Sequence, residues 1–193
     1  MKQLDMFEQA DKQNISGLGY VQNYITFEEE SALIDIIDKQ EWRTDLKRRV
    51  QHYGYRYDYK NKKLDHHYLG SIPNWLTNLC DRLLNEGFFY VLPDQVIVNE
   101  YLPGQGITSH IDCVPCFGYT VCSLSLCSTC VMELTNGALT RRCLLEPRSL
   151  LILSDEARYL WKHGIMARKH DLYDGYVIAR KRRVSLTFRK VLL

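Results

Sequence analysis

A histidine and an aspartate two residues apart, His110 and Asp112, form the one His-x-Asp tripeptide in the chain. On a strand such side chains project to the same side, so both would reach one metal ion. A third ligand would come from His163 or His170, and spacing alone leaves both open. Two histidines and one carboxylate leave positions at which iron(II) can hold a keto acid and dioxygen together. The alternative is a chance tripeptide in a solvated turn.

Near the C-terminus, the segment RVSLTFR places four polar side chains at alternate positions: Arg183, Ser185, Thr187 and Arg189. On a strand they share one face. If that face points inward, its two guanidinium groups need anionic partners, because an unpaired buried charge is costly. A dicarboxylate fits, since the planar fork of arginine binds a carboxylate through two hydrogen bonds. The alternative is an exposed basic edge strand that binds phosphates.

Tyrosines alternate with other residues in a segment rich in cations, at positions Tyr53, Tyr55, Tyr57 and Tyr59. The cations around them are Arg48, Arg49, Arg56, Lys60, Lys62 and Lys63. On one strand the tyrosines would share a face, and with the cations they would suit a surface that stacks on bases and neutralises phosphates. The alternative is a half-buried edge strand. A second basic cluster at 180–183 alternates between faces, so its members need not act together.

Seven cysteines include two pairs at Cys-x-x-Cys spacing, Cys113 with Cys116 and Cys127 with Cys130. Two thiolate pairs could complete a tetrahedral zinc site, but buried free cysteines are also common. The odd count and the polar start of the chain, without a signal-peptide pattern, lead us to expect reduced thiols in the cytoplasm, or in the nucleus of a eukaryote.

The elements that must position these residues fall into two halves. A capping box at Thr26 and Glu29 begins an expected helix over 27–40, and a second helix follows Pro73 and ends near Gly87. From Val96 onward, short strand-like segments alternate with turns: VIVNEYL, YTVCSLSLC, VMELT, RRCLLE, SLLILS and RRVSLTFRKVLL. This predicts a mainly β (α+β) fold, a sandwich or jelly roll with flanking helices.

Composition agrees with one domain over residues 1–193. The chain is 46% hydrophobic and 25% charged, with a formal net charge of +2, so bulk charge identifies no partner. No run of residues approaches the length of a membrane span, so we expect a soluble protein with no membrane partner. The sequence does not identify protein partners or an oligomeric state.

Four blocks in order resemble the AlkB family of iron(II) and 2-oxoglutarate-dependent dioxygenases: NEYLPGQGITSHID, SLSL, ARYLWKHGI and RRVSLTFRK, between residues 99 and 190. The resemblance implies a double-stranded β-helix core, a jelly-roll variant, and a reaction that uses dioxygen. It also implies that His110, Asp112 and His163 are the iron ligands, with His170 excluded. The residues it implies for 2-oxoglutarate are Asn99, Tyr101, Arg183 and Arg189.

The resemblance implies more than one possible class of substrate. Family members hydroxylate carbon atoms on nucleic-acid bases, and an N-methyl group so oxidised leaves as formaldehyde. We therefore expect oxidative demethylation of alkylated bases in DNA or RNA. The segments RRVQHYGYRYDY and EARYLW resemble the branch that hydroxylates modified wobble uridines in tRNA, which is the alternative. Val114 stands where some repair members place an acidic residue. A protein hydroxylase and a non-catalytic nucleic-acid-binding jelly roll are further alternatives.

Overall fold

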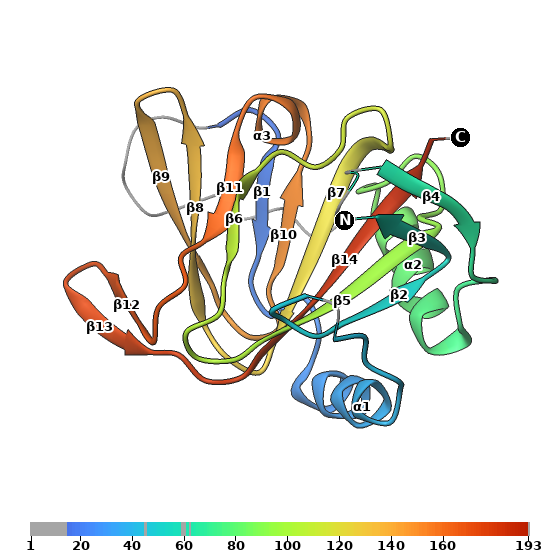
Figure 1. Ribbon diagram of the computed structural model, residues 1–193, viewed down its shortest axis with the longest axis horizontal. Helices are drawn as coiled ribbons and strands as arrows, with labels where there is room; N and C mark the ends of the chain where they lie inside the picture. The colour runs from blue at the N-terminus through green and yellow to red at the C-terminus, as the bar shows by residue number, and fades with distance from the viewer. Residues whose placement is uncertain (1–14, 45, 59–60, 62, 193) are drawn as a thin grey trace.

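Two antiparallel sheets face one another in the computed structural model, which describes residues 15–44, 46–58, 61 and 63–192, without the side chains of 63–67 (Figure 1). The larger sheet has six strands in the order β1-β10-β7-β14-β5-β2. Their bounds are β1 Leu18–Val21, β10 Leu150–Leu153, β7 Phe117–Leu126, β14 Arg183–Val191, β5 Gln95–Tyr101 and β2 Val50–Tyr53.

The smaller sheet has four strands in the order β6-β11-β8-β9. They are β6 Ile107–His110, β11 Lys162–Ile165, β8 Cys130–Asn136 and β9 Leu139–Leu145. Two hairpins extend from the sandwich: β3 Tyr55–Asp58 with β4 Lys63–Tyr68, and β12 His170–Tyr173 with β13 Tyr176–Ala179. They lie at opposite sides of Figure 1.

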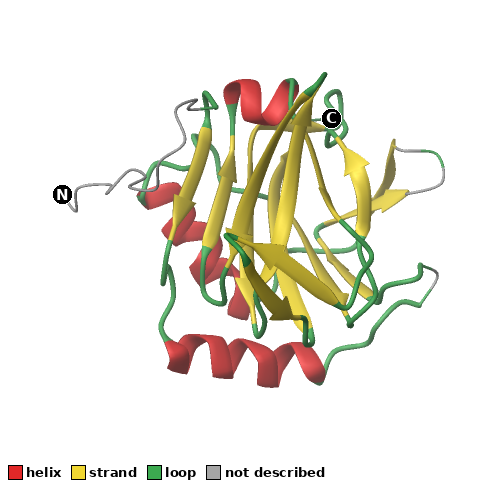
Figure 2. Ribbon diagram, turned by 90° about the vertical axis from the view of Figure 1, so that its left-hand side faces the viewer, coloured by secondary structure: helices red, strands yellow, loops and turns green. Residues whose placement is uncertain are grey.

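Helices α1 (Phe27–Asp38) and α2 (Asn74–Asn85) cover the outer face of the six-stranded sheet, and Figure 2 shows these two longer helices outside the strands. Thr26 and Glu29 form the expected capping box at the start of α1. Leu33 and Ile37 of α1 and Leu76 of α2 join one buried cluster with Val98 and Leu186 of the sheet. Alternate residues of each central strand therefore pack against the helices, and the residues between them face the other sheet.

A second core fills part of the space between the two sheets. Leu151 and Leu153 of β10 meet Met132 and Leu134 of β8 and Trp161, which immediately precedes β11. A short helix, α3 (Asp155–Tyr159), joins β10 to β11 at one end of the sandwich. In the described part of the chain, no helix has the length and apolar character that a membrane crossing requires.

The expected fold class is confirmed: the architecture is the double-stranded β-helix, with the expected helices and six expected strands in place. The short strands β1, β4 and β11 to β13, and helix α3, were not predicted because each is too short to show a clear period. The expectation that Asp112 lies on a strand is wrong, because β6 ends at His110 and Asp112 lies in the loop that follows.

The expectation of four tyrosines on one strand face is wrong. Gly54, at φ +77°, breaks the segment into β2 of the large sheet and β3 of a separate hairpin. A Cβ at this position would lie 1.8 Å from the Asp94 carbonyl oxygen, so the close approach requires glycine. Tyr53 packs edge-on against Trp75 of α2, with ring centroids 5.3 Å apart, whereas Tyr55 and Tyr57 belong to the hairpin. Tyr59 lies outside the described residues.

Candidate active site

Strand pairing in the smaller sheet brings two distant histidines together. His110 of β6 and His163 of β11 are direct cross-strand partners, and their ring centroids are 4.5 Å apart. Gly164 allows this close pairing, because a Cβ there would lie 2.8 Å from the Cα of Ser109. Asp112 extends from the loop after β6, and its Oδ2 lies 3.9 Å from His163 Nε2. One ligand atom from each of the three residues lies within 4.8 Å of the others, which makes them a candidate metal site.

The protonation states of the three side chains suit metal binding. His110 Nδ1 lies 2.8 Å from the Thr108 carbonyl oxygen, so this nitrogen donates and leaves the Nε2 lone pair for a metal. Burial lowers the pKa of His163 to about 4, which keeps its imidazole neutral. Burial alone would raise the pKa of Asp112, but Arg189 and the two histidines hold it well below its usual range. The triad therefore presents a neutral imidazole at His163, the Nε2 atom of His110 and one carboxylate, a set of ligand types typical of non-haem iron(II).

A cavity of about 840 Å³ lies between the sheets beside the triad. One of its walls, which we call the cavity floor, is formed by Asn99 and Tyr101 of β5 and Arg183 and Arg189 of β14. The register pairs Arg183 with Tyr101 and Ser185 with Asn99, so these side chains lie in adjacent rows. All four residues expected at the co-substrate site thus line one cavity with the candidate metal ligands.

The two floor arginines retain hydrogen-bonding capacity. Arg183 is only 3% exposed, and its Nη2 donates to Ser125 Oγ at 2.8 Å. Its Nε has no hydrogen-bond partner, and none of the described carboxylates forms an ion pair with it. Arg189 donates to Asp112 Oδ1 at 2.9 Å, and its Nε also lacks a partner. A buried guanidinium group without a counter-ion calls for an anion, and a dicarboxylic keto acid fits it.

The rim hairpin β3–β4 lies at the edge of the cavity and contributes Tyr57 to its lining. Tyr57 lines the cavity with its ring centroid 5.7 Å from that of Phe117, and Tyr55 packs 5.1 Å from Tyr68. Two of the cations expected on a nucleic-acid surface have other contacts. Arg48 lines the cavity and donates to Asn99 Oδ1 at 3.0 Å, and Arg49 forms an ion pair with Glu100. Lys60 and Lys62 lie outside the described residues.

The remaining predicted features separate from the site. His170 is exposed on β12, away from the triad. Cys113 and Cys116 form a disulfide, which corrects the expectation of reduced thiols at this pair and leaves no thiolates there for zinc. In the second pair, Cys127 is exposed and Cys130 is buried, and the triad is the metal-binding group found among the described residues.

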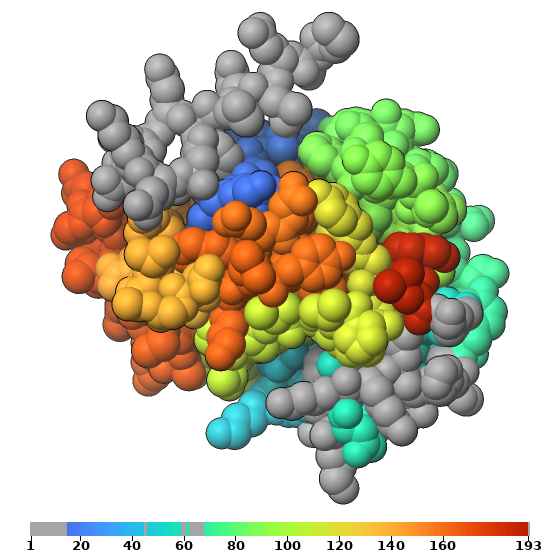
Figure 3. All heavy atoms as spheres, turned by 90° about the horizontal axis from the view of Figure 1, so that it is seen from above, coloured from blue at the N-terminus to red at the C-terminus, as the bar shows by residue number. Residues whose placement is uncertain are grey.

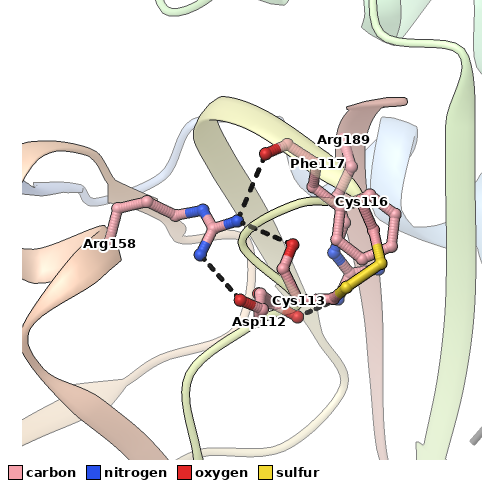
Figure 4. Close-up of a disulfide and its surroundings, with 6 residues drawn as sticks. All are labelled: Asp112, Cys113, Cys116, Phe117, Arg158 and Arg189. Carbon is pink, nitrogen blue, oxygen red and sulfur yellow. Dashed lines mark hydrogen bonds and ion pairs between the residues drawn. A yellow bond between two sulfur atoms is a disulfide. The ribbon is translucent and has the colours of Figure 1, made fainter. Parts of the chain in front are cut away.

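Two arginines at the site were not singled out from the sequence for the roles that their contacts show. Arg48, which we expected on a nucleic-acid-binding surface, instead contacts Asn99 and Tyr101 of the cavity floor. Arg158, 2% exposed, reaches from α3 to the loop that carries Asp112, as Figure 4 shows. Its position five residues before His163 was the available signal, but a sequence does not reveal a side chain that bonds to main-chain carbonyl groups.

A double-stranded β-helix that holds two histidines and a carboxylate beside a basic cavity is the architecture of the non-haem iron oxygenases. The model of the 2OG-Fe(II) oxygenase superfamily matches residues 17–189, and the chain belongs to this superfamily, within its AlkB branch. It is therefore a dioxygenase enzyme, and the alternative of a non-catalytic jelly roll is no longer tenable. Membership implies iron(II), 2-oxoglutarate and dioxygen.

Several known proteins are similar to this chain. An uncharacterised protein, L905, of Acanthamoeba polyphaga mimivirus is 36% identical over 96% of this chain and 90% of its own length. The "Alkylated DNA repair protein ALKBH8 homolog" of Arabidopsis thaliana is 35% identical, over 92% of this chain and 59% of its own.

Mouse "tRNA (carboxymethyluridine(34)-5-O)-methyltransferase ALKBH8" is 34% identical over 97% of this chain, which spans 33% of the mouse protein. The solved structure of OsALKBH1 has a TM-score of 0.72 at 18% identity, and the match covers 92% of this chain and 99% of that one. This structural similarity supports the assignment of the double-stranded β-helix fold.

Proposed function

We propose that this chain, as a single domain, uses iron(II) and 2-oxoglutarate to oxidise a carbon atom on a nucleic-acid base. The observation that carries the proposal is the position of Arg183, which is buried without a counter-ion in the cavity that also contains the metal triad. A nearby anion would remove the cost of burying that charge. The aromatic rim hairpin at the edge of the cavity would supply a surface on which an extruded base could stack.

In this proposal each residue has a defined task. His110, Asp112 and His163 would hold iron(II), and Arg189 would keep the Asp112 carboxylate ionised and oriented through its hydrogen bond to Oδ1. When bound, the metal and dioxygen would supply the oxidative decarboxylation of the keto acid and the coupled hydroxylation of a substrate C–H bond.

The floor would hold the keto acid. Arg183 would bind its distal carboxylate through its fork of donors, and Asn99 and Tyr101 would contact the rest of it. Apolar side chains such as Val121, Leu151 and Leu153 also line the cavity and would limit the access of water. Tyr57, supported by its contact with Phe117, would present its ring to the base.

For the reaction, oxidative demethylation of an alkylated base in DNA or RNA is the leading candidate. The similarity to a protein named for alkylated DNA repair supports it. Among the described residues that line the cavity, Asp112 is the only acidic one, and it faces Arg189. The cavity lining also contains Lys47, Arg48 and Lys162. This charge balance favours a neutral methylated base over a cationic one, because no free carboxylate would offset the substrate's charge.

Hydroxylation of a modified wobble uridine in tRNA is the second candidate, and two observations favour it. One is the similarity to mouse ALKBH8, whose name specifies a carboxymethyluridine of tRNA. The other is the same cationic cavity, which would accept a neutral or carboxylated uridine. Because the chain spans a third of the mouse protein, the substrate cannot be transferred with the name.

Nucleoside mass spectrometry distinguishes the candidates. The protein would be incubated with iron(II), ascorbate and 2-oxoglutarate, and in parallel with N-methylated DNA, N-methylated RNA and bulk tRNA. A loss in mass of one CH2 unit from a base would establish demethylation, and a gain of one oxygen on a uridine would establish hydroxylation.

The His110→Ala variant serves as the control, because it should change no nucleoside. If no nucleoside changed in any of the three nucleic acids while succinate still formed, the nucleic-acid assignment would be wrong.

A further inference from the structure

The loop from Asp112 to Phe117 is held at its main chain by a single buried arginine. Arg158 Nη1 donates to the Asp112 carbonyl oxygen at 2.9 Å. Its Nη2 donates to the carbonyl oxygens of Cys113 at 3.3 Å and Phe117 at 3.4 Å. Figure 4 shows the guanidinium group pointing from α3 toward all three carbonyl groups. One planar group thus fixes both ends of the loop that starts with a candidate metal ligand.

Arg158 is also close in the chain to His163, another of the three candidate metal ligands. Arg158 lies five residues before His163, and α3 leads directly into β11. The main chain of α3 is anchored in turn, because Ala157 N donates to the Ser16 carbonyl oxygen at 3.0 Å. Seen from above in Figure 3, the orange α3 and β11 region lies against the yellow-green segment after β6. Arg158 therefore connects the segment that carries Asp112 to the segment that carries His163.

The hydrogen bonds of Arg158 go to main-chain carbonyl groups and not to a carboxylate. None of the ion pairs among the described residues joins Arg158 to a carboxylate, and its Nε has no hydrogen-bond partner. A positive charge beside a metal site also disfavours a cation electrostatically. What only arginine provides is a rigid fork that reaches separate carbonyl oxygens at once.

We infer that Arg158 is a positioning residue for the metal site: it sets the place of Asp112 relative to His163 by bonding to main-chain carbonyl groups. The inference rests on the proposed metal site but not on the proposed substrate. Supporting contacts around metal ligands typically change metal affinity or activity by roughly 10–100-fold when lost. We expect an effect of that size on metal affinity.

The test is titration of the full chain with cobalt(II), followed by visible absorption, which reports both affinity and coordination. Two variants separate geometry from charge. Arg158→Lys keeps the charge but loses the fork, and Arg158→Met removes both. We expect each to weaken cobalt binding by roughly 10–100-fold and to alter the visible spectrum. If Arg158 acted only through its charge, the lysine variant would resemble the wild type and the methionine variant would bind cobalt more tightly.

A matched control removes the effect of general destabilisation. Arg148 also ties a loop to a helix, since its Nη1 lies 2.8 Å from Glu30 Oε2, but it does not line the cavity. Arg148→Met should lower the melting temperature of the metal-free protein and leave cobalt affinity unchanged. With saturating iron(II), the Arg158→Lys variant should keep the wild-type KM for 2-oxoglutarate, because Arg183 is intact.

The inference would be overturned if both Arg158 variants bound cobalt within twofold of the wild type with an unchanged spectrum, whatever their melting temperature. Failure of the metal site itself would look different. In that case His110→Ala would bind cobalt as tightly as the wild type.

Discussion

The cavity floor and the rim hairpin face the same space but are built differently. The floor lies on β5 and β14, central strands of a six-stranded sheet, and every residue of β5 is buried. The rim hairpin has two strands, β3 is half-buried throughout, and its pairing shifts register between Tyr55 and Tyr57. A two-stranded hairpin is only marginally stable by itself, so the rim depends on contacts such as that of Tyr57 with Phe117.

This difference suggests a division of tasks. The floor and the triad are held by strand register, so they are suited to a co-substrate and metal that are the same in every turnover. The rim is held by ring contacts and can adapt to a base that must enter and leave. Substitutions in the floor should therefore impair every reaction of the enzyme. Substitutions in the rim should impair only those that involve the nucleic acid.

The largest effect is expected from Arg183→Met in the floor. Truncating one partner of a buried, hydrogen-bonded charge pair costs about 2–5 kcal/mol, which corresponds to a rise in the KM for 2-oxoglutarate of roughly 30-fold to several thousandfold. The measurement is succinate formation against 2-oxoglutarate concentration, with and without an oligonucleotide.

Arg182→Met is the matched control, because the adjacent Arg182 points away from the cavity to Asp38 and Glu100. It should leave the KM for 2-oxoglutarate unchanged. Equal KM values for wild type and Arg183→Met would show that the floor does not bind the distal carboxylate.

Gly54→Ala tests the joint between the large sheet and the rim hairpin. A left-handed backbone costs a residue with a Cβ about 1–2 kcal/mol, and relief of the 1.8 Å approach to Asp94 costs a further 1–3 kcal/mol or so. Urea denaturation should show a loss of about 2–5 kcal/mol. Gly87→Ala, at φ +82° with open space around the new Cβ, should show the backbone cost alone. Similar losses in the two variants would mean that the Gly54 contact is relaxed cheaply.

The two regions also differ in how well the sequence predicts them. The floor was predictable because alternation on one long strand places Arg183 and Arg189 on the same face whatever the rest of the fold does. The same reasoning failed for the tyrosines, since a single left-handed glycine at position 54 transfers the chain from one sheet to another. Alternation holds only as long as the strand continues.

Contacts between distant segments were the other limit. The choice of His163 over His170 followed from family resemblance, and the structure explains it by the cross-strand pairing of His163 with His110. Spacing in the sequence contains no information on that pairing. The contacts of Arg48 with Asn99 and of Arg158 with the Asp112 loop likewise depend on the assembled fold.

Tyr57→Ala probes the rim alone. Stacking of a base on an aromatic side chain contributes about 1–3 kcal/mol, so the KM for the oligonucleotide should rise by roughly 5-fold to 150-fold. Succinate formation without nucleic acid should stay at the wild-type rate, because the floor and triad are unchanged. Tyr176→Ala on β13, where the tyrosine is 76% exposed and outside the cavity lining, is the control and should change neither value. A parallel loss of both activities in Tyr57→Ala would contradict the division between rim and floor.

The smallest effect is expected next to the start of β2, at the end of that strand away from the rim hairpin, where Arg49 meets Glu100 on the outward face of β5. Arg49 donates to the Glu100 carboxylate at 2.6 and 2.8 Å, and Arg182 donates to it at 2.7 Å. The hydrogen bonds from Arg49 are the main reason that the pKa of Glu100 is lowered. A carboxyl group with a lowered folded-state pKa stabilises the fold fully above its unfolded pKa of about 4.3 and loses that contribution as the pH falls through the folded value.

Glu100→Gln should therefore reduce stability at pH 7 by about 1 kcal/mol, a modest value because Arg49 is half-exposed. The difference from the wild type should shrink as the pH falls below about 4. Urea denaturation between pH 7 and pH 3 measures both quantities, with Glu41→Gln, at an exposed position, as the control. Since Glu100 faces away from the cavity, the KM for 2-oxoglutarate should not change. A rise in that KM would show that the outward face of β5 and the floor are coupled, and that the floor is not held by strand register alone.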